Sequence, residues 1–229
     1  QGGLTYTSNL ACVCMPTRKT TNGVTTFDGV SIPELGSQCT TWAAARPNVF
    51  FCQGLQTKLG KDKRKSLNMA WEYAGHPFNS VNTRPWMGPK FWCPDMQGTA
   101  DGNNYKVFRF ADALLMLAEC YNELGDDATA VEYLNQTRNR AGLGDYTYRT
   151  SARLQDEIRN ERARELFGEF QRKFDLVRWG IWYQAVTDYT DYQRLLDNLV
   201  PCREYYPIPD KEVVYSGNAL DNDEYKKYG

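Results

Sequence analysis

The sequence RFADALLMLAECYNELGDDATAVEYLNQTRNRAG, residues 109–142, decides the fold. Apolar residues recur at steps of three and four in both of its halves, which is the spacing of one buried helix face. Gly125 and Gly142 can end the two helices in the left-handed conformation, and Asp126 or Asp127 can cap the start of the second. Helices joined by so short a turn lie antiparallel, so the stretch predicts an αα-hairpin. The residues expected on its apolar faces are Phe110, Leu114, Leu117, Ala118, Tyr121, Ala130, Val131, Leu134 and Thr137.

The hairpin also fits one unit of a tetratricopeptide-like repeat. If Ala118 is the small residue of the first helix, suitable positions are occupied by Leu117, Tyr121, Gly125, Ala130 and Leu134. A lone unit cannot bury its own face. Either partner units lie outside this chain, or the rest of the chain covers that face.

Two further helices are expected directly after the hairpin, up to residue 180. Thr150 or Ser151 can cap the third, and Leu154, Ile158 and Leu166 form its apolar stripe. Acidic and arginine residues alternate at helical spacing over residues 161–178. Because they stand among aromatic residues, we expect partly buried ion pairs that tie the fourth helix to the hairpin.

Composition limits the possible functions. The chain has 229 residues, 41% of them hydrophobic, which is enough for one large domain or two small ones. A net charge of −1 gives no basic face for nucleic acid. The sequence has no run of about 18 apolar residues that would span a membrane.

Residues 1–108 lack a sustained helical period and are rich in Gly, Pro and aromatic residues, which predicts an irregular, loop-rich region. Its tryptophans either pack as core on the helical scaffold or face outward to stack on a ligand. The basic run GKDKRK at 60–65 is more simply a solvated face than a phosphate or anion site, because no glycine-rich cradle precedes it. We therefore expect a mainly α fold in which a tetratricopeptide-like scaffold supports a loop-rich region.

Metal and nucleophilic chemistry find little support in the sequence. The single His76 excludes two-histidine zinc sites, and Cys12-Val-Cys14 is at most half of a zinc site. There is no Gly-x-Ser-x-Gly elbow. A glycosidase needs only two carboxylates, but the helical carboxylates here are matched with arginines, which suits structure better than acid catalysis. We expect no catalytic residue, no metal and no cofactor.

Binding is the remaining function class. The CH faces of sugar rings stack on Trp and Tyr, while sugar hydroxyls bind amide, carboxylate and guanidinium groups. Polar aromatic loops also serve protein interfaces, so a peptide or protein ligand is the alternative. The candidate ligand-binding residues are Trp42, Trp71, Tyr73, Asn79, Arg84, Trp86 and Trp92.

Five blocks of the sequence resemble, in order and spacing, the C-terminal half of the RagB/SusD family. They are RFADALLMLAECYNELG, AVEYLNQTRNRAGL, LQDEIRNERARELFGEFQRKFDLVRWG, YYPIPDKEV and NALDNDEYKKYG. TRPWMGPKFW, at 83–92, resembles the family's lead-in to the hairpin. The resemblance covers residues 66–229 well and residues 1–65 only by position.

The resemblance implies a surface-exposed outer-membrane lipoprotein of Bacteroidetes-type bacteria. Such proteins bind oligosaccharides, or in some members peptides, and act as a lid on a TonB-dependent transporter of the SusC type. The further tetratricopeptide-like units and the lipid anchor would then belong to an N-terminal half, so we expect this chain to be a fragment of a longer protein. Residues 1–108 would be the ligand-binding region and 109–229 the C-terminal helical region of one continuous domain.

The residues that match the family's motifs are implied to be scaffold rather than ligand-binding residues. Ligand residues in the family sit in variable loops, so none is transferred by matching. The scaffold residues carried over are Arg109, Glu119, Asn135, Arg138, Arg140, Glu161, Arg162, Arg172, Asp175 and Arg178.

Overall fold

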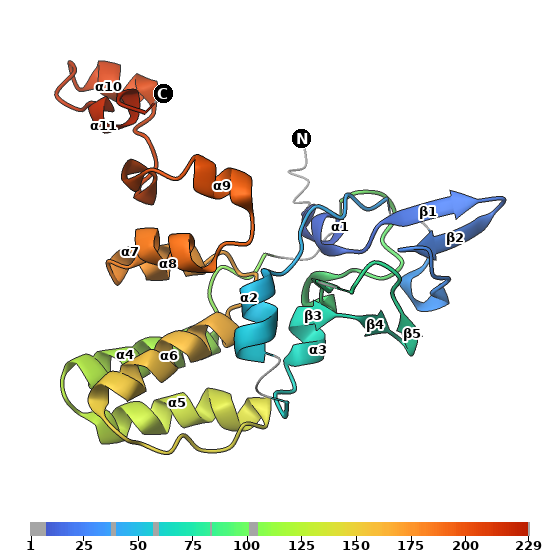
Figure 1. The fold of residues 1–229 in the computed structure, drawn as a ribbon, viewed down its shortest axis with the longest axis horizontal. Helices are drawn as coiled ribbons and strands as arrows, with labels where there is room; N and C mark the ends of the chain where they lie inside the picture. Colours follow the sequence, from blue (N-terminus) through green and yellow to red (C-terminus); the bar gives the residue numbers. More distant parts are fainter. Residues whose placement is uncertain (1–7, 38–39, 57–59, 83, 101–104, 229) are drawn as a thin grey trace, which may run out of the picture. The chain divides into compact units, whose positions relative to one another are not determined.

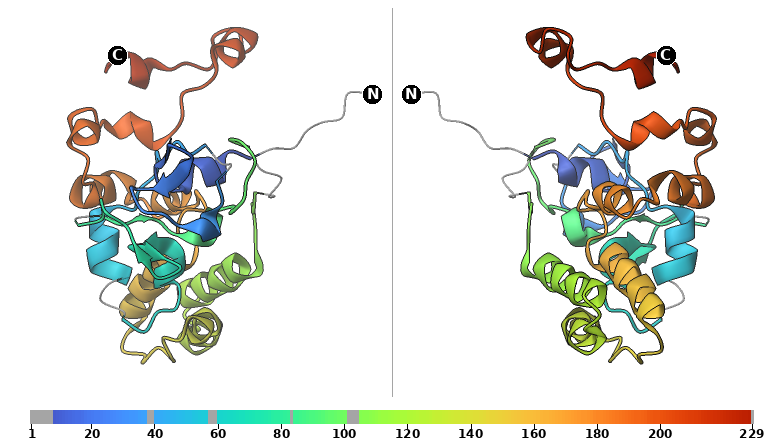
Figure 2. Two further views of the ribbon diagram at one scale, coloured as in Figure 1. Left: turned by 90° about the vertical axis from the view of Figure 1, so that its right-hand side faces the viewer. Right: turned by 90° about the vertical axis from the view of Figure 1, so that its left-hand side faces the viewer.

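Three helices form the centre of the structure, a computed structural model that describes residues 8–37, 40–56, 60–82, 84–100 and 105–228. They are α4 (Phe110–Glu123), α5 (Asp127–Ala141) and α6 (Ser151–Glu165). All three pack against one another, as Figure 1 and both views of Figure 2 show. Their shared core consists of Leu115, Ala118, Ala130, Leu134, Leu154 and Ile158. The predicted hairpin and third helix are confirmed.

Local signals in the sequence set the ends of these helices. The Asp126 carboxylate accepts a hydrogen bond from the backbone N–H of Thr129 at the start of α5, and Thr150 Oγ1 accepts one from Arg153 N at the start of α6. Gly142 ends α5 with φ of 82°, in the left-handed region where a Cβ would cause strain. These caps agree with the sequence prediction.

The buried face of α4 differs from the predicted one. Phe110 and Leu117, expected inside, are 74% and 39% exposed, whereas Leu115 is fully buried. The reason is that α6 packs on α4 as well as α5 does, so two helices turn the buried face toward Ala111, Leu115 and Ala118. One side of α4 is therefore left open in the described part of the chain.

Residues 8–100 form short elements around a second core. The helical ones are α1 (Leu10–Cys14), η1 (Pro33–Leu35), α2 (Val49–Phe51), the π-helical turn η2 (Cys52–Gln56), α3 (Lys65–Asn68) and η3 (Pro89–Phe91). The strands are β1 (Arg18–Thr21), β2 (Val24–Phe27), β3 (Met69–Ala70), β4 (Glu72–Tyr73), β5 (His76–Pro77) and β6 (Trp86–Met87). Three antiparallel pairs result: β1 with β2, β3 with β6, and β4 with β5. The elements are short, as the density of Gly and Pro predicts.

The β1–β2 hairpin has a local cause. Asn22 and Gly23 form its two-residue turn with φ of 51° and 80°, the geometry of a type I′ turn that joins twisted antiparallel strands. The register places Thr21 opposite Val24 and Arg18 opposite Phe27. Phe27 at the end of β2 is then fully buried in the core of this region.

Contacts divide the chain into two units, residues 1–170 and 171–229. The second holds α7 (Arg172–Arg178), α8 (Trp182–Tyr189), α9 (Gln193–Asp197), η4 (Pro201–Glu204), α10 (Asp210–Tyr215) and α11 (Asp223–Lys226). Residues 8–100 thus share a unit with α4–α6. The assignment of residues 1–108 as the ligand-binding region and of 109–229 as the C-terminal helical region of one continuous domain stays a prediction.

None of the helices in the described ranges combines the length and the apolar character that a membrane span requires.

Candidate ligand-binding site

A hollow of about 290 Å³ opens beside α3 in the first unit. Its walls come from the chain around α3, from β3, and from the turn that leads into β4. The lining residues are Asp62, Lys63, Lys65, Ser66, Met69, Trp71 and Glu72. Trp71 is the one member of the predicted ligand-binding set among them, and its side chain is half-buried.

Arg64 fixes the segment that forms the hollow. Its buried guanidinium donates to Asp62 at 2.7 and 2.9 Å, to Glu161 Oε1 at 2.8 Å and to Glu165 Oε2 at 2.8 Å. Glu161 and Glu165 lie one turn apart on α6, so one arginine joins the loop to that helix. A buried charge network of this kind is costly to break, because removal of one partner leaves the others desolvated and unpaired.

Two further bonds attach the same segment to the helices. The buried Asn68 side chain at the end of α3 donates to the carbonyl of Arg164 at 2.9 Å. The backbone N–H of Lys63 donates to the carbonyl of Ala141 at 2.9 Å, which places α3 near the C-terminal end of α5, as Figure 1 shows. These bonds therefore attach the segment that lines the hollow to α5 and α6.

The network continues along α6 and the turn that follows it. Glu165 also accepts from Arg109 and Arg140, and Glu169 accepts from Arg109 at 2.8 Å and from Lys90 at 2.5 Å. Burial alone would raise the pKa of Glu165, but the hydrogen bonds and charges of these arginines hold that pKa at about 2. The carboxylate therefore stays ionised and serves as a structural anion.

Other predicted scaffold residues also form ion pairs. Arg162 lies 2.9 Å from Asp112 and so joins α6 to α4. In the second unit, Asp175 accepts from Arg178 at 2.9 Å, and the Arg172 guanidinium lies 5.4 Å from the centre of the Trp179 ring. The expected buried ion pairs are present. Within the first unit they also join α6 and the turn after it to the loop region through Arg64 and Lys90, two partners that the sequence analysis did not predict. The expected tie between the fourth helix and the hairpin stays a prediction, as does the scaffold role of the half-buried Glu119 on α4.

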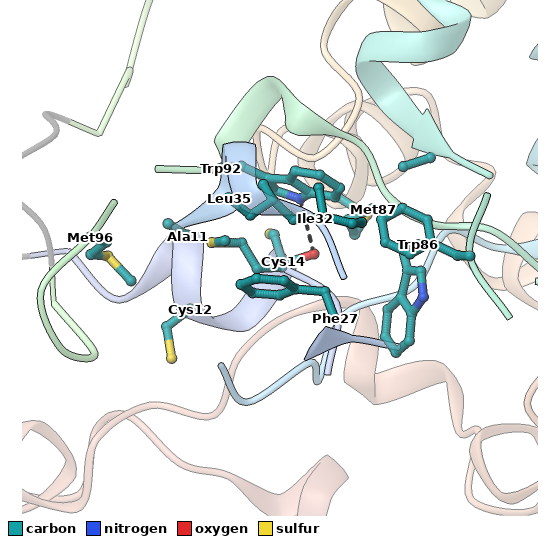
Figure 3. Close-up of a cluster of buried hydrophobic side chains, with 13 residues drawn as sticks. Ala11, Cys12, Cys14, Phe27, Ile32, Leu35, Trp86, Met87, Trp92 and Met96 are labelled. Carbon is teal, nitrogen blue, oxygen red and sulfur yellow. Dashed lines mark hydrogen bonds between the residues drawn. The ribbon is translucent and has the colours of Figure 1, made fainter. Parts of the chain in front are cut away.

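Trp86 and Trp92 lie in the core instead of facing outward. They are 4% and 7% exposed, and Figure 3 shows both rings among the buried side chains. The Trp92 indole donates to the Cys14 carbonyl at 3.2 Å, and the Arg46 guanidinium lies 3.6 Å from the centre of the Trp86 ring. Stacking on a sugar needs an open ring face, so this packing removes both tryptophans from the candidate set.

Asn79 and Arg84 take part in a hydrogen-bonded cluster that holds the loops together. Asn79 Nδ2 donates to the Asp28 carbonyl at 2.9 Å, and the Arg84 carbonyl accepts from Arg46 at 3.1 Å. The Asp28 carboxylate accepts from Ser80 and from the Trp86 indole. Burial would raise its pKa, but the Ser80 and Trp86 hydrogen bonds and the charge of Arg46 lower it below the usual value.

The last two predicted residues lie outside the hollow. Tyr73 is half-buried, and its ring leans on Trp92 with the two ring centres 5.2 Å apart. Trp42 is 52% exposed, but it is not among the residues that line the hollow. The structure therefore keeps Trp71 as the best-placed aromatic of the predicted set and Trp42 as an exposed ring elsewhere.

The polar residues of the hollow were not among the predicted ones. The side chains of the run at 60–65 alternate in direction: Arg64 is buried and lies outside the lining of the hollow, whereas Lys63 and Lys65 lie in that lining. Asp62 also belongs to the lining, but it is buried and paired with Arg64. The order Asp62, Lys63, Arg64, Lys65 is a signal that could have suggested a segment with one face paired to the protein and the other open to solvent. The position of Trp71 in the sequence, six residues after Lys65, could not have shown which residues line the hollow with it.

Metal binding has no geometric basis in the described residues. They contain no group of three or more His, Cys, Asp and Glu side chains placed to hold an ion. Glu157, Glu161 and Glu165 of α6 are paired with arginines, so a metal cation would meet like charges there. The absence of a metal or cofactor stays a prediction.

Comparison with known proteins gives consistent matches. The model of the SusD family matches residues 56–225. SusD-like protein P25 of Formosa agariphila is 35% identical over 177 residues, which cover 71% of this chain and 31% of that protein. The starch-binding protein SusD of Bacteroides thetaiotaomicron is 31% identical over 137 residues, 58% of this chain and 24% of that protein.

A solved structure adds the fold. A SusD superfamily protein from Bacteroides vulgatus superposes with a TM-score of 0.60 at 29% identity, over 80% of this chain and 44% of that one. The mainly helical architecture is therefore shared with that superfamily. This chain spans less than half the length of each of these relatives.

Proposed function

The chain belongs to the SusD family, and from this premise we propose that it binds oligosaccharides at the surface of the bacterial cell without altering them chemically. The hollow beside Trp71 is the place where a sugar ring would rest. A relative that is 31% identical is named for the starch that it binds, which supports a carbohydrate as the ligand class.

The observation that carries this proposal is a half-buried indole that lines a hollow together with hydrogen-bonding residues, on a segment that Arg64 anchors to α6. Trp71 offers an apolar surface, and the Ser66 hydroxyl, the Lys65 amine and the Glu72 carboxylate line the same hollow. A volume of about 290 Å³ is close to the lower end of small-molecule sites, roughly 300 Å³. The hollow therefore suits one sugar unit of a longer chain, with the neighbouring units in solvent.

A binding role also suits the carboxylates better than hydrolysis does. A glycosidase needs an acid that is protonated near its working pH. Glu165, with a pKa of about 2, is ionised at any physiological pH, and Glu161 and Glu169 are held in ion pairs with arginine and lysine. Incubation with polysaccharides should release no reducing ends over time, and a steady release would contradict the proposal.

The wider setting follows the family premise. We expect an outer-membrane lipoprotein whose lipid anchor lies in an N-terminal half, and which passes its ligand to a TonB-dependent transporter of the SusC type. The open side of α4 supports a helical partner from that half, since Phe110 and Leu124 are 74% and 81% exposed on it. We expect no nucleic acid partner, given a net charge of −1.

A peptide- or protein-binding scaffold of the same family is the second candidate. The exposed apolar side of α4 favours it, because amphipathic helices bind in grooves beside such faces. Screening of peptides and glycans against the same protein preparation in one calorimetric panel separates the two candidates.

The direct test replaces Trp71. The Trp71→Ala protein should be retained less by a polysaccharide in affinity electrophoresis, with at least a tenfold weaker affinity, or about 1.4 kcal/mol. Its melting temperature should stay close to that of the parent chain, because the ring is only half-buried. Trp179→Ala, which removes a half-buried indole of the second unit, serves as the matched control and should keep its retention.

Two outcomes would contradict the proposal. Retention of the Trp71→Ala protein equal to that of the parent would remove the hollow from consideration. Peptide binding by a parent chain that retains no polysaccharide would favour the second candidate.

A further inference from the structure

We propose that the hollow beside Trp71 prefers a sugar that carries a negative charge, such as a carboxylate or a sulfate group. This inference rests on the proposed function, because it names the class of glycan that the same hollow would select. Two observations support it. Charged side chains line the hollow, and the buried ion-pair network neutralises one of them, Asp62, but not the two lysines.

The lining holds two acidic and two basic side chains, but they are not equally available. The Asp62 side chain is fully buried and binds Arg64 through both carboxylate oxygens, at 2.9 Å from Nε and 2.7 Å from Nη2. Its charge is thereby matched by a partner that lies outside the lining. Lys63, Lys65 and Glu72 remain, so the open charge of the hollow is positive.

The lysines of the lining are not neutralised by a carboxylate among the described residues, although the Lys65 ammonium lies over the Trp71 ring. Across the described part of the chain, neither Lys63 nor Lys65 takes part in an ion pair, and Lys63 is exposed. Arg64, between them, is turned inward to Glu161 and Glu165. Because the backbone is anchored by that residue, the two flanking ammonium groups are presented on the open side.

The network behind the hollow does not cancel this charge. Its named cations outnumber its named carboxylates, so the interior adds no negative potential to oppose an anion. The cations are Arg64, Lys90, Arg109, Arg138, Arg140 and Arg164, and the carboxylates are Asp62, Glu157, Glu161, Glu165 and Glu169.

The distance between the amine and the indole suits a charged sugar. Lys65 Nζ lies over the Trp71 ring, 5.6 Å from its centre, and so occupies part of the space above that ring. A sugar that stacks on the open part of the indole would bring an acidic substituent at the edge of its ring within reach of that amine. Stacking and charge attraction would then act on one sugar unit at the same time.

Glu72 limits the size of the effect, since its carboxylate lines the same hollow and repels an anion. Exposed charges are also screened over about 8 Å at physiological ionic strength. We therefore expect a preference of roughly five- to tenfold for the charged sugar at low salt, and a smaller one as salt increases.

The expectation of a purely solvated face at 60–65 is thus revised, because the run borders a hollow with an aromatic wall.

The experiment compares glycans that share a backbone and differ chiefly in charge. Polygalacturonate and its fully methyl-esterified form share the same backbone, and dextran sulfate is compared with dextran to separate sulfate from carboxylate. Affinity electrophoresis of the parent chain should show stronger retention by a charged member than by its neutral partner. The ratio should fall when sodium chloride is raised from 20 to 300 mM, as charge attraction requires.

A double variant locates the effect. Lys63→Gln with Lys65→Gln should bring the ratio of charged to neutral retention down to about one, whatever the change in the retention of neutral glycan. Lys19→Gln with Lys106→Gln removes the same charge from exposed lysines outside the hollow and should leave the preference intact.

The inference and the proposed function fail in different ways. Equal retention of charged and neutral partners, with both dependent on Trp71, would overturn the charge preference and leave glycan binding standing. A preference that survives the Lys63 and Lys65 changes, or the loss of Trp71, would also overturn it, since the attraction would then arise elsewhere on the surface. Retention of no glycan at all would remove the proposed function itself.

Discussion

Arg64 shows how a single residue connects the helices to the ligand-binding region. It lies in a basic run, yet its guanidinium is buried against three carboxylates, two of which belong to α6. The guanidinium carries several donors in a planar fork, so it can serve all three at once. Lys63 and Lys65, on either side of Arg64, line the hollow. Arg64 therefore holds this segment in place, while the charges of the two lysines remain available to a ligand.

Glu165 should make the stability of the protein depend on acid pH. Its folded pKa of about 2 lies below the ordinary value of 4.5, so the ionised form is the one that the folded state stabilises. This contribution is complete above about pH 4.5 and is lost as the pH falls toward 2. The size of the shift corresponds to roughly 3 kcal/mol.

Urea unfolding between pH 2.5 and 7 checks this dependence. The Glu165→Gln protein should be less stable than the parent at pH 7 by about 3 kcal/mol, and the difference should shrink in acid. Glu132→Gln, which removes an exposed carboxylate from α5, should follow the parent at every pH. A difference between Glu165→Gln and the parent that stays constant with pH would refute the assigned role.

At the scale of elements, α3 depends on a close approach by β6. Gly88, directly after β6, donates its N–H to the Asn68 carbonyl at 2.8 Å. A Cβ at this position would lie 2.2 Å from the Leu67 carbonyl oxygen and 2.6 Å from the Asn68 carbonyl carbon, both backbone atoms. Glycine is required here because the two backbones touch.

The Gly88→Ala protein should therefore be destabilised. Overpacking against backbone costs roughly 1–3 kcal/mol and should shift α3, which forms a wall of the hollow. Urea unfolding measures the loss, and glycan retention should weaken with it. The control is Gly54→Ala, where an added Cβ meets nothing within 4 Å, and its stability should change little. An equal effect of the two substitutions would show that the close approach is unimportant.

The helices illustrate what a local pattern can and cannot predict at this scale. The caps at Asp126 and Thr150 and the stop at Gly142 depend on neighbouring residues; the stop was predicted, and each cap was one of the two candidates that the sequence offered. The face of α4 was predicted less well, because its orientation depends on α6, whose contacts with α4 come from residues far along the chain. Leu115, which is fully buried, was not in the predicted stripe, whereas Ala118, which is equally buried, was.

At the scale of the whole molecule, the two units differ in how much they bury. The helices α4, α5 and α6 share a core of fully buried side chains, whereas α9, η4, α10 and α11 contain no buried residue. Local stability follows buried apolar contact, so the units should not open with the same free energy.

Hydrogen exchange on this chain should therefore show two levels of protection. Amides of α9–α11 should exchange at least about a hundredfold faster than the central amides of α4–α6. Mass spectrometry of peptic fragments resolves these segments. Equal protection in both would mean that residues 171–229 unfold only together with the first unit.

The sequence by itself determined the helical hairpin, its caps, the third helix and the family, because these depend on residues within a few positions of one another or on the order of motifs. The tertiary structure alone decided which tryptophan stays open: Trp86 and Trp92 are covered by residues as distant as Cys14 and Asp28. It also decided that the lysine run borders a hollow, since Arg64 reaches a glutamate 97 residues away. Burial depends on contacts between distant segments, and periodicity along one segment carries no information about them.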